Sequence, residues 1–161
     1  MSVVNAQVWI AILVGLAAVI DDLRRRQIAD WIPLAALTGG LAWQVASYGW
    51  AGWMYGLGGA AAGFAVFLIF YLLGGMGGGD VKLMTGFGAL LGAGGLLEAA
   101  LWTAGVGGLL ALGVLTYRAL RDKLAGAPAE PSTPEQKLRQ ASIPYAPAIA
   151  LGVWLSLVPK G

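Results

Sequence analysis

Apolar and polar positions divide the chain into six long apolar segments, separated by short polar or glycine-rich connections. A membrane-spanning helix needs about 20 mostly apolar residues, and most of these segments approach that length. The sequence therefore predicts an all-α integral membrane protein, with a single membrane-embedded domain over residues 1–161. The six transmembrane helices are expected at about residues 3–20, 31–50, 54–73, 81–94, 99–117 and 143–158, with a turn at 95–98.

Local signals in the second and third segments support these expected helices. Pro33 falls in the first turn of the second segment, where a missing backbone N–H costs little. Asp30, just before that segment, is expected to be its N-cap. Gly59 and Gly63 form a GxxxG pattern in the third segment, and such a pattern lets helices pack closely in lipid.

The composition agrees with a membrane location. Apolar residues make up 58% of the chain, charged residues 11%, and the mean hydropathy is +0.75. A soluble domain usually carries about 25% charged residues. No Lys or Arg precedes the first apolar segment, so we expect a retained spanning helix rather than a cleaved signal peptide.

The distribution of Lys and Arg predicts the orientation in the membrane. In a six-helix arrangement, only Lys160 falls on one side, and nine basic residues fall in loops on the other. These nine are Arg24, Arg25, Arg26, Lys82, Arg118, Arg121, Lys123, Lys137 and Arg139. Because basic residues concentrate in cytoplasmic loops, we expect those loops inside and both termini outside. Residues 118–142, which contain three prolines, are expected to form a flexible cytoplasmic loop.

Two acidic sites interrupt the apolar pattern. Residues 74–82 read GGMGGGDVK, so five glycines lead into Asp80, and Asp21 and Asp22 close the first apolar segment. A carboxylate in apolar sequence is energetically expensive and therefore suggests a function. Asp22 ends the first helix and Asp80 begins the fourth, so both are expected at the cytoplasmic membrane border, although they are 58 positions apart.

The missing residue types narrow the possible chemistry. The chain has no cysteine and no histidine, which excludes a thiolate nucleophile, a Ser-His-Asp triad and a His-ligated zinc. Two close carboxylates share a proton, so the charged one can activate water while the neutral one donates a hydrogen bond to a carbonyl oxygen. The bare backbone at Gly77, Gly78 and Gly79 would let an extended substrate strand lie close by.

Simpler interpretations of the same residues stay open. Asp21, Asp22 and Asp30 could be interfacial residues that balance the three arginines. Lys82 is expected to mark the membrane border, although it could bind substrate or act on Asp80. A phosphate cradle at the glycines is weakly supported, because no strand precedes them.

The motifs resemble those of the type IV prepilin peptidases, a family of membrane aspartic proteases. Residues 75–83 look like the family's GxGD motif. Residues 22–31 are similar to its other motif, although Ala29-Asp30 stands where the family commonly has Pro-Asn. Residues 143–150 look like its closing helix, so the resemblance covers about residues 3–154.

The resemblance implies a GxGD aspartic peptidase-like bundle with Asp22 and Asp80 as the catalytic residues. Asp22 is preferred to Asp21 because it has the family's six-residue spacing to Ile28. The implied substrate is a prepilin or pseudopilin, cut at the cytoplasmic border of a bacterial inner membrane. The absence of cysteines matches the short, peptidase-only forms of tight-adherence (Flp-type) pilus systems, so no methyltransferase activity is expected. No metal, cofactor or nucleic acid is implied, and the sequence does not indicate an oligomeric state.

Two other function classes remain possible from the sequence. A small proton-coupled transporter would also need buried carboxylates, placed nearer the middle of the membrane. A non-enzymatic membrane subunit of a pilus or secretion assembly would not need the aspartates at all. The glycine loop at the membrane border favours the peptidase.

Overall fold

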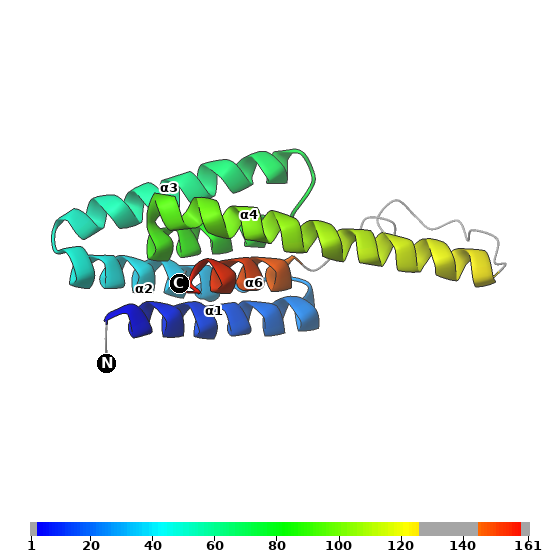
Figure 1. The fold of residues 1–161 in the computed structure, drawn as a ribbon, viewed down its shortest axis with the longest axis horizontal. Coiled ribbons are helices and arrows are strands. Elements are labelled where there is room, and N and C mark those ends of the chain that lie inside the picture. The colour runs from blue at the N-terminus through cyan, green and yellow to red at the C-terminus, as the bar shows by residue number, and fades with distance from the viewer. Residues whose placement is uncertain (1–2, 126–144, 159–161) are drawn as a thin grey trace.

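A computed structural model describes residues 3–125 and 145–158, and every regular element in these two ranges is a helix. The all-α prediction is therefore confirmed for this part of the chain. The helices lie side by side along one direction (Figure 1). They are α1 (Val3–Arg25), α2 (Trp31–Tyr48), α3 (Ala51–Leu72), α4 (Gly78–Ala125) and α6 (Ala146–Ser156).

The long helix α4 is broken at Gly92, where φ is 70° and ψ is 172°. Residues other than glycine rarely adopt this backbone conformation. Before the break, Leu90 lies beside Gly40 of α2, while after it Gly107 lies against Tyr145 at the start of α6. Gly107 and Tyr145 line one cavity with Met76, which precedes α4. Because α4 therefore returns to the end of the bundle where it began, the chain reverses direction at Gly92 (Figure 1). Helix α4 is therefore two antiparallel helices joined by one residue.

Near this reversal, two glutamine side chains donate hydrogen bonds to one backbone carbonyl, that of Leu90. The Nε2 of Gln7 donates to the Leu90 carbonyl at 2.9 Å, and the Nε2 of Gln44 donates to the same oxygen at 3.3 Å. Gln44 is buried. A helix end inside apolar surroundings needs such partners, because an unpaired backbone group there is costly.

Several expected boundaries were wrong. Residues 95–98 are helical, so the turn lies at Gly92 instead. The helix after Gly92 continues to Ala125, into the segment expected to be a loop, and residues 126–142 of that segment lie outside the described ranges. Helix α1 also continues past residue 20, to Arg25. There the Nε of Arg25 pairs with Asp21 one turn earlier, at 3.2 Å.

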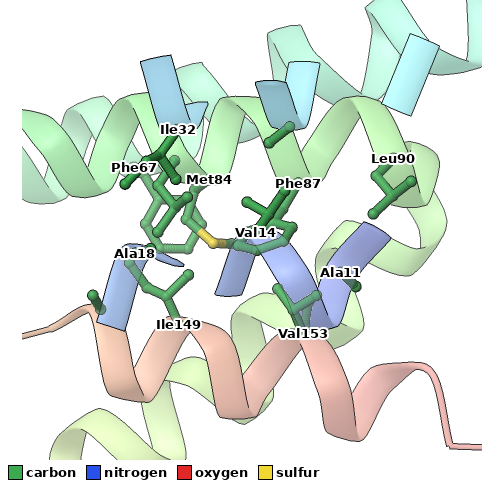
Figure 2. Close-up of a cluster of buried hydrophobic side chains, with 14 of the residues drawn as sticks. Ala11, Val14, Ala18, Ile32, Phe67, Met84, Phe87, Leu90, Ile149 and Val153 are labelled. Carbon is green, nitrogen blue, oxygen red and sulfur yellow. The ribbon is translucent and has the colours of Figure 1, made fainter. Parts of the chain in front are cut away.

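The part of α4 before Gly92 lies at the centre of the bundle. Its side chains Leu83, Met84, Phe87 and Leu90 are fully buried. Figure 2 shows residues of α1 and α6 packed around these side chains of α4. The labelled residues from those two helices are Ala11, Val14, Ala18, Ile149 and Val153. This packing fixes the helix whose first turn contains Asp80.

Glycines let α3 approach this central helix closely. A Cβ at Gly59 would collide with the carbonyl oxygen of Gly88, and a Cβ at Gly63 would come within 2.6 Å of the Met84 carbonyl oxygen. The close packing predicted for the Gly59–Gly63 pattern is thus confirmed. Backbone contact of this kind is typical of helices that associate in lipid.

Three helical stretches are long and apolar enough to cross a membrane, judged by length and composition within the described residues. They are Ala6–Arg25, Ala51–Leu72 and Gly78–Tyr117, the last of which contains the reversal at Gly92, while Ala146–Ser156 is shorter. Large apolar side chains such as Trp50, Met54 and Leu72 are exposed on the surface. These features are those of a multi-pass membrane protein, and six spans remain the prediction.

The tight contact between α3 and α4 gives a first prediction. Gly59→Ala should lower the free energy of unfolding by about 2 kcal/mol, because its new methyl group meets rigid backbone. Gly58→Ala is the matched control, since a Cβ there meets nothing within 4 Å. Thermal unfolding of both variants in detergent micelles, followed by circular dichroism, measures the difference. Equal melting temperatures would contradict the close packing.

Candidate functional site

The glycine-rich connection between α3 and α4 turns sharply before Asp80. Gly74 has a φ of 75°, and the N–H groups of Gly74 and Gly75 donate to the carbonyls of Tyr71 and Phe70, both at 2.9 Å. These bonds end α3 with a positive-φ glycine just past its end, as in many helix C-termini. The chain is then free to start α4 in a new direction.

Asp80 caps the beginning of α4. It lies in the first turn, and its Oδ2 accepts a hydrogen bond from the N–H of Gly77 at 3.1 Å. Its own N–H donates to the Gly77 carbonyl, also at 3.1 Å. Asp80 is only 8% exposed. Gly77 therefore holds Asp80 twice, once through the side chain and once through the backbone.

Asp22 lies in the last turn of α1 and is held from a distant part of the chain. Its Oδ2 accepts a hydrogen bond from the N–H of Ala146, the first residue of α6, at 3.1 Å. Asp22 is 7% exposed. A carboxylate that contacts the start of a helix is stabilised by the N–H groups that have no partner there.

The structure brings Asp22 and Asp80 to the same cavity, which has a volume of about 540 Å³. The two side chains reach this cavity from different helices, Asp22 from the last turn of α1 and Asp80 from the first turn of α4. Gly77, Gly78, Gly79 and Lys82 also line this cavity. All six residues singled out from the sequence therefore meet at one place. The remaining lining residues are Asp21, Arg25, Arg26, Gln27, Ile28, Ala29 and Asp30.

The neighbouring Asp21 has a different task. Its Oδ2 accepts the N–H of Ala29 at 2.8 Å, and its Oδ1 faces the Nε of Arg25 at 3.2 Å. Asp21 thus closes the connection between α1 and α2 onto α1. The two adjacent aspartates therefore have different partners, because Asp22 contacts the start of α6 while Asp21 contacts the α1–α2 connection.

Asp30 and Lys82 join the two sides of the cavity. The Nζ of Lys82 lies 2.6 Å from Oδ1 of Asp30. Asp30 occupies the N-cap position of α2 as expected, but the expected cap is absent, because its side chain makes no capping hydrogen bond. Both side chains are well exposed, so their ion pair contributes little to stability.

The close approach of Gly79 to Ile28 shapes the floor of the cavity. A Cβ at Gly79 would lie 3.2 Å from the Cβ of Ile28. A larger residue at position 79 would therefore push the glycine loop away from the α1–α2 connection.

Within residues 3–125 and 145–158, no group of three or more His, Cys, Asp or Glu side chains is arranged to hold a metal ion.

Sequence reasoning missed one member of the site, the backbone N–H of Ala146. Every residue except proline has a backbone N–H, so the residue type does not show that this one is part of the site. The only available signal was the run at residues 143–150, in which Pro147 occupies the first turn of α6. Contact with Asp22 depends on the packing of α6, which pattern alone does not reveal.

Comparison with known proteins identifies one family. The model of the type IV leader peptidase family matches residues 9–112, which is more than half of the chain and includes both Asp22 and Asp80. Searches of curated proteins and of solved structures found no match.

The contacts of Asp21 give a second prediction. Asp21→Ala should loosen the α1–α2 connection, because it removes both the acceptor for Ala29 and the partner of Arg25. Trypsin should then cut after the arginines at 24–26 several times faster than in the unaltered protein. The cleavage rate of Asp21→Asn should lie between those of Asp21→Ala and the unaltered protein, since its amide oxygen can still accept the Ala29 N–H.

Asp30→Ala is the control for this digestion, because Asp30 pairs with an exposed lysine rather than with the connection's backbone. If both alanine variants were cut at the same rate, Asp21 would not be the residue that closes the connection. Gel electrophoresis of timed digests in detergent gives the rates.

Proposed function

The chain belongs to the type IV leader peptidase family, and we propose that it is an aspartic endopeptidase that removes the leader peptide of prepilin-like proteins. One observation carries this proposal. Asp22 and Asp80 come from two different helices, are both nearly buried, and line one cavity. Two neighbouring carboxyl groups of this kind form the device that activates water in aspartic proteases.

The proposed reaction uses one carboxyl group in each protonation state. The ionised carboxylate takes a proton from water as the water oxygen attacks the carbonyl carbon of the scissile peptide bond. The protonated carboxyl group donates a hydrogen bond to the carbonyl oxygen, which carries the developing negative charge. The tetrahedral intermediate then breaks its C–N bond, and the amine leaves with a proton from the dyad. The products are a new carboxyl terminus and a new amino terminus.

The glycine loop supports binding of an extended peptide. Gly77, Gly78 and Gly79 line the cavity beside Asp80. Because these residues have no side chains, a substrate backbone can come close to the loop and to the carboxyl groups at once. We propose that this edge of the cavity receives the residues around the scissile bond.

The position of the cavity supports a cut at the membrane border. Asp22 is in the last turn of α1 and Asp80 in the first turn of α4, so both lie at one end of the bundle. Arg25, Arg26 and Lys82 line the same cavity. We propose that this end faces the cytoplasm at a bacterial inner membrane, since basic residues concentrate on that side.

This position also weighs against the proton-coupled transporter. Carboxylates that carry protons across a membrane are expected nearer its middle, and these two lie at helix ends. Lys82 pairs with Asp30, which favours its role at the border over direct binding of substrate. The proposed partner is thus a prepilin or pseudopilin, presented from the bilayer.

The third prediction tests the dyad. Asp22→Asn and Asp80→Asn should each reduce cleavage of a prepilin reporter at least 100-fold, because an amide can neither accept the proton nor supply it. Cleavage in membranes or liposomes, followed by the mobility shift of the reporter, measures the rates. Insertion of each variant is checked by its amount in the membrane fraction.

Asp21→Asn is the matched control, because it changes the adjacent carboxylate, which contacts Ala29 and Arg25 instead. It should keep most of the activity. If Asp80→Asn cleaved the reporter as fast as the unaltered protein, the aspartic mechanism would be wrong. An assembly subunit without enzymatic activity would show no cleavage in any form.

A further inference from the structure

Helix α6 lies outside the part of the chain that matches the family, yet it is built firmly into the bundle. The family match ends at residue 112, and α6 begins at Ala146. Gly152 packs against Thr103 so closely that a Cβ there would collide with it. The Nε1 of Trp154 donates to the Ala11 carbonyl at 3.0 Å. These contacts fix α6 against α4 and α1.

We propose that the first turn of α6 is a positioning element of the active site, and that the Ala146 N–H orients the Asp22 carboxyl group for reaction. The inference rests on the proposed function. Its structural basis is the buried hydrogen bond from Ala146 to Oδ2 of Asp22 at 3.1 Å.

The local sequence makes this donor available. The first N–H groups of a helix have no acceptor within the helix. Pro147 follows Ala146 and has no N–H, so it supplies no competing donor. Proline also fixes φ at a value that suits a helix beginning. The Ala146 N–H is thereby directed at the last turn of α1.

Orientation matters here because Asp22 is at a helix end, with several charged groups around it. Asp21 from α1, Arg26 from the following connection and Asp80 from α4 line the same cavity. The hydrogen bond from α6 holds Oδ2 and leaves Oδ1 as the oxygen for the attacking water. Catalytic groups must be held within a fraction of an ångström of their working position.

The experiment replaces single backbone N–H groups by oxygen. Nonsense suppression with lactic acid at position 146 turns the peptide bond into an ester and deletes the N–H that reaches Asp22. The same replacement at Ala148 is the matched control, because it is also an alanine in the first turn of α6. Each ester weakens one carbonyl acceptor at the helix beginning, so the two variants differ chiefly in the contact with Asp22.

The ester at 146 should lower kcat for a prepilin reporter at least tenfold and leave KM within twofold. The ester at 148 should leave both constants within twofold. Equal effects of the two esters, no effect at 146, or a change at 146 in KM alone would overturn the proposal. So would an ester at 146 that prevents folding while the ester at 148 folds normally, since the bond would then serve stability instead of orientation.

A second variant moves α6 as a whole. Gly152→Ala should displace it from Thr103 and Ala99 and so lower kcat about fivefold or more, whereas Leu151→Ala, at an exposed neighbouring position, should not. Unchanged kcat in Gly152→Ala would count against the proposal. Failure of the unaltered protein to cleave the reporter would instead refute the proposed function itself, and the two failures are therefore distinguishable.

Discussion

Backbone groups at helix ends need hydrogen-bond partners when they are buried in apolar surroundings, and much of this structure follows from that constraint. At one end of the bundle, the reversal at Gly92 leaves the Leu90 carbonyl, and the amides of Gln7 and Gln44 donate to it. At the other end, the N–H of Gly77 just before α4 and the N–H of Ala146 at the start of α6 need acceptors. The side chains of Asp80 and Asp22 supply them.

The two acidic residues of the candidate site therefore also act as caps. This dual use has a chemical consequence. Each carboxyl group is tied by one oxygen to a backbone donor, so its orientation is fixed by helix packing rather than by a flexible ion pair. The central position of α4 before Gly92, packed between α1, α3 and α6, carries that rigidity to the cavity.

The sequence predicted the all-helical class, the close packing of Gly59 and Gly63, and the meeting of Asp22 with the glycine loop. These features can be recognised in the sequence, because charged residues and glycine patterns within apolar segments are rare and have few explanations. The turn expected at 95–98 was wrong, since a single glycine with φ of 70° reverses the chain at residue 92 and residues 95–98 are helical. The contact of Ala146 with Asp22 could not be predicted, because nearly every residue has a backbone N–H and the residue type does not show which one reaches Asp22. The capping hydrogen bond expected at Asp30 was also absent, since its side chain found Lys82, a partner 52 positions away.

The adjacent pair Asp21 and Asp22 shows how helix geometry separates structure from chemistry. Successive side chains on an α-helix point about 100° apart, because one turn takes 3.6 residues. One of two adjacent carboxylates can therefore face the α1–α2 connection while the other faces the bundle. Asp21 binds Ala29 and Arg25, and Asp22 binds the start of α6. Both residues line the cavity with Asp80, but the extension of α1 to Arg25 gives them different partners, so that Asp22 contacts the start of α6 and Asp21 holds the α1–α2 connection.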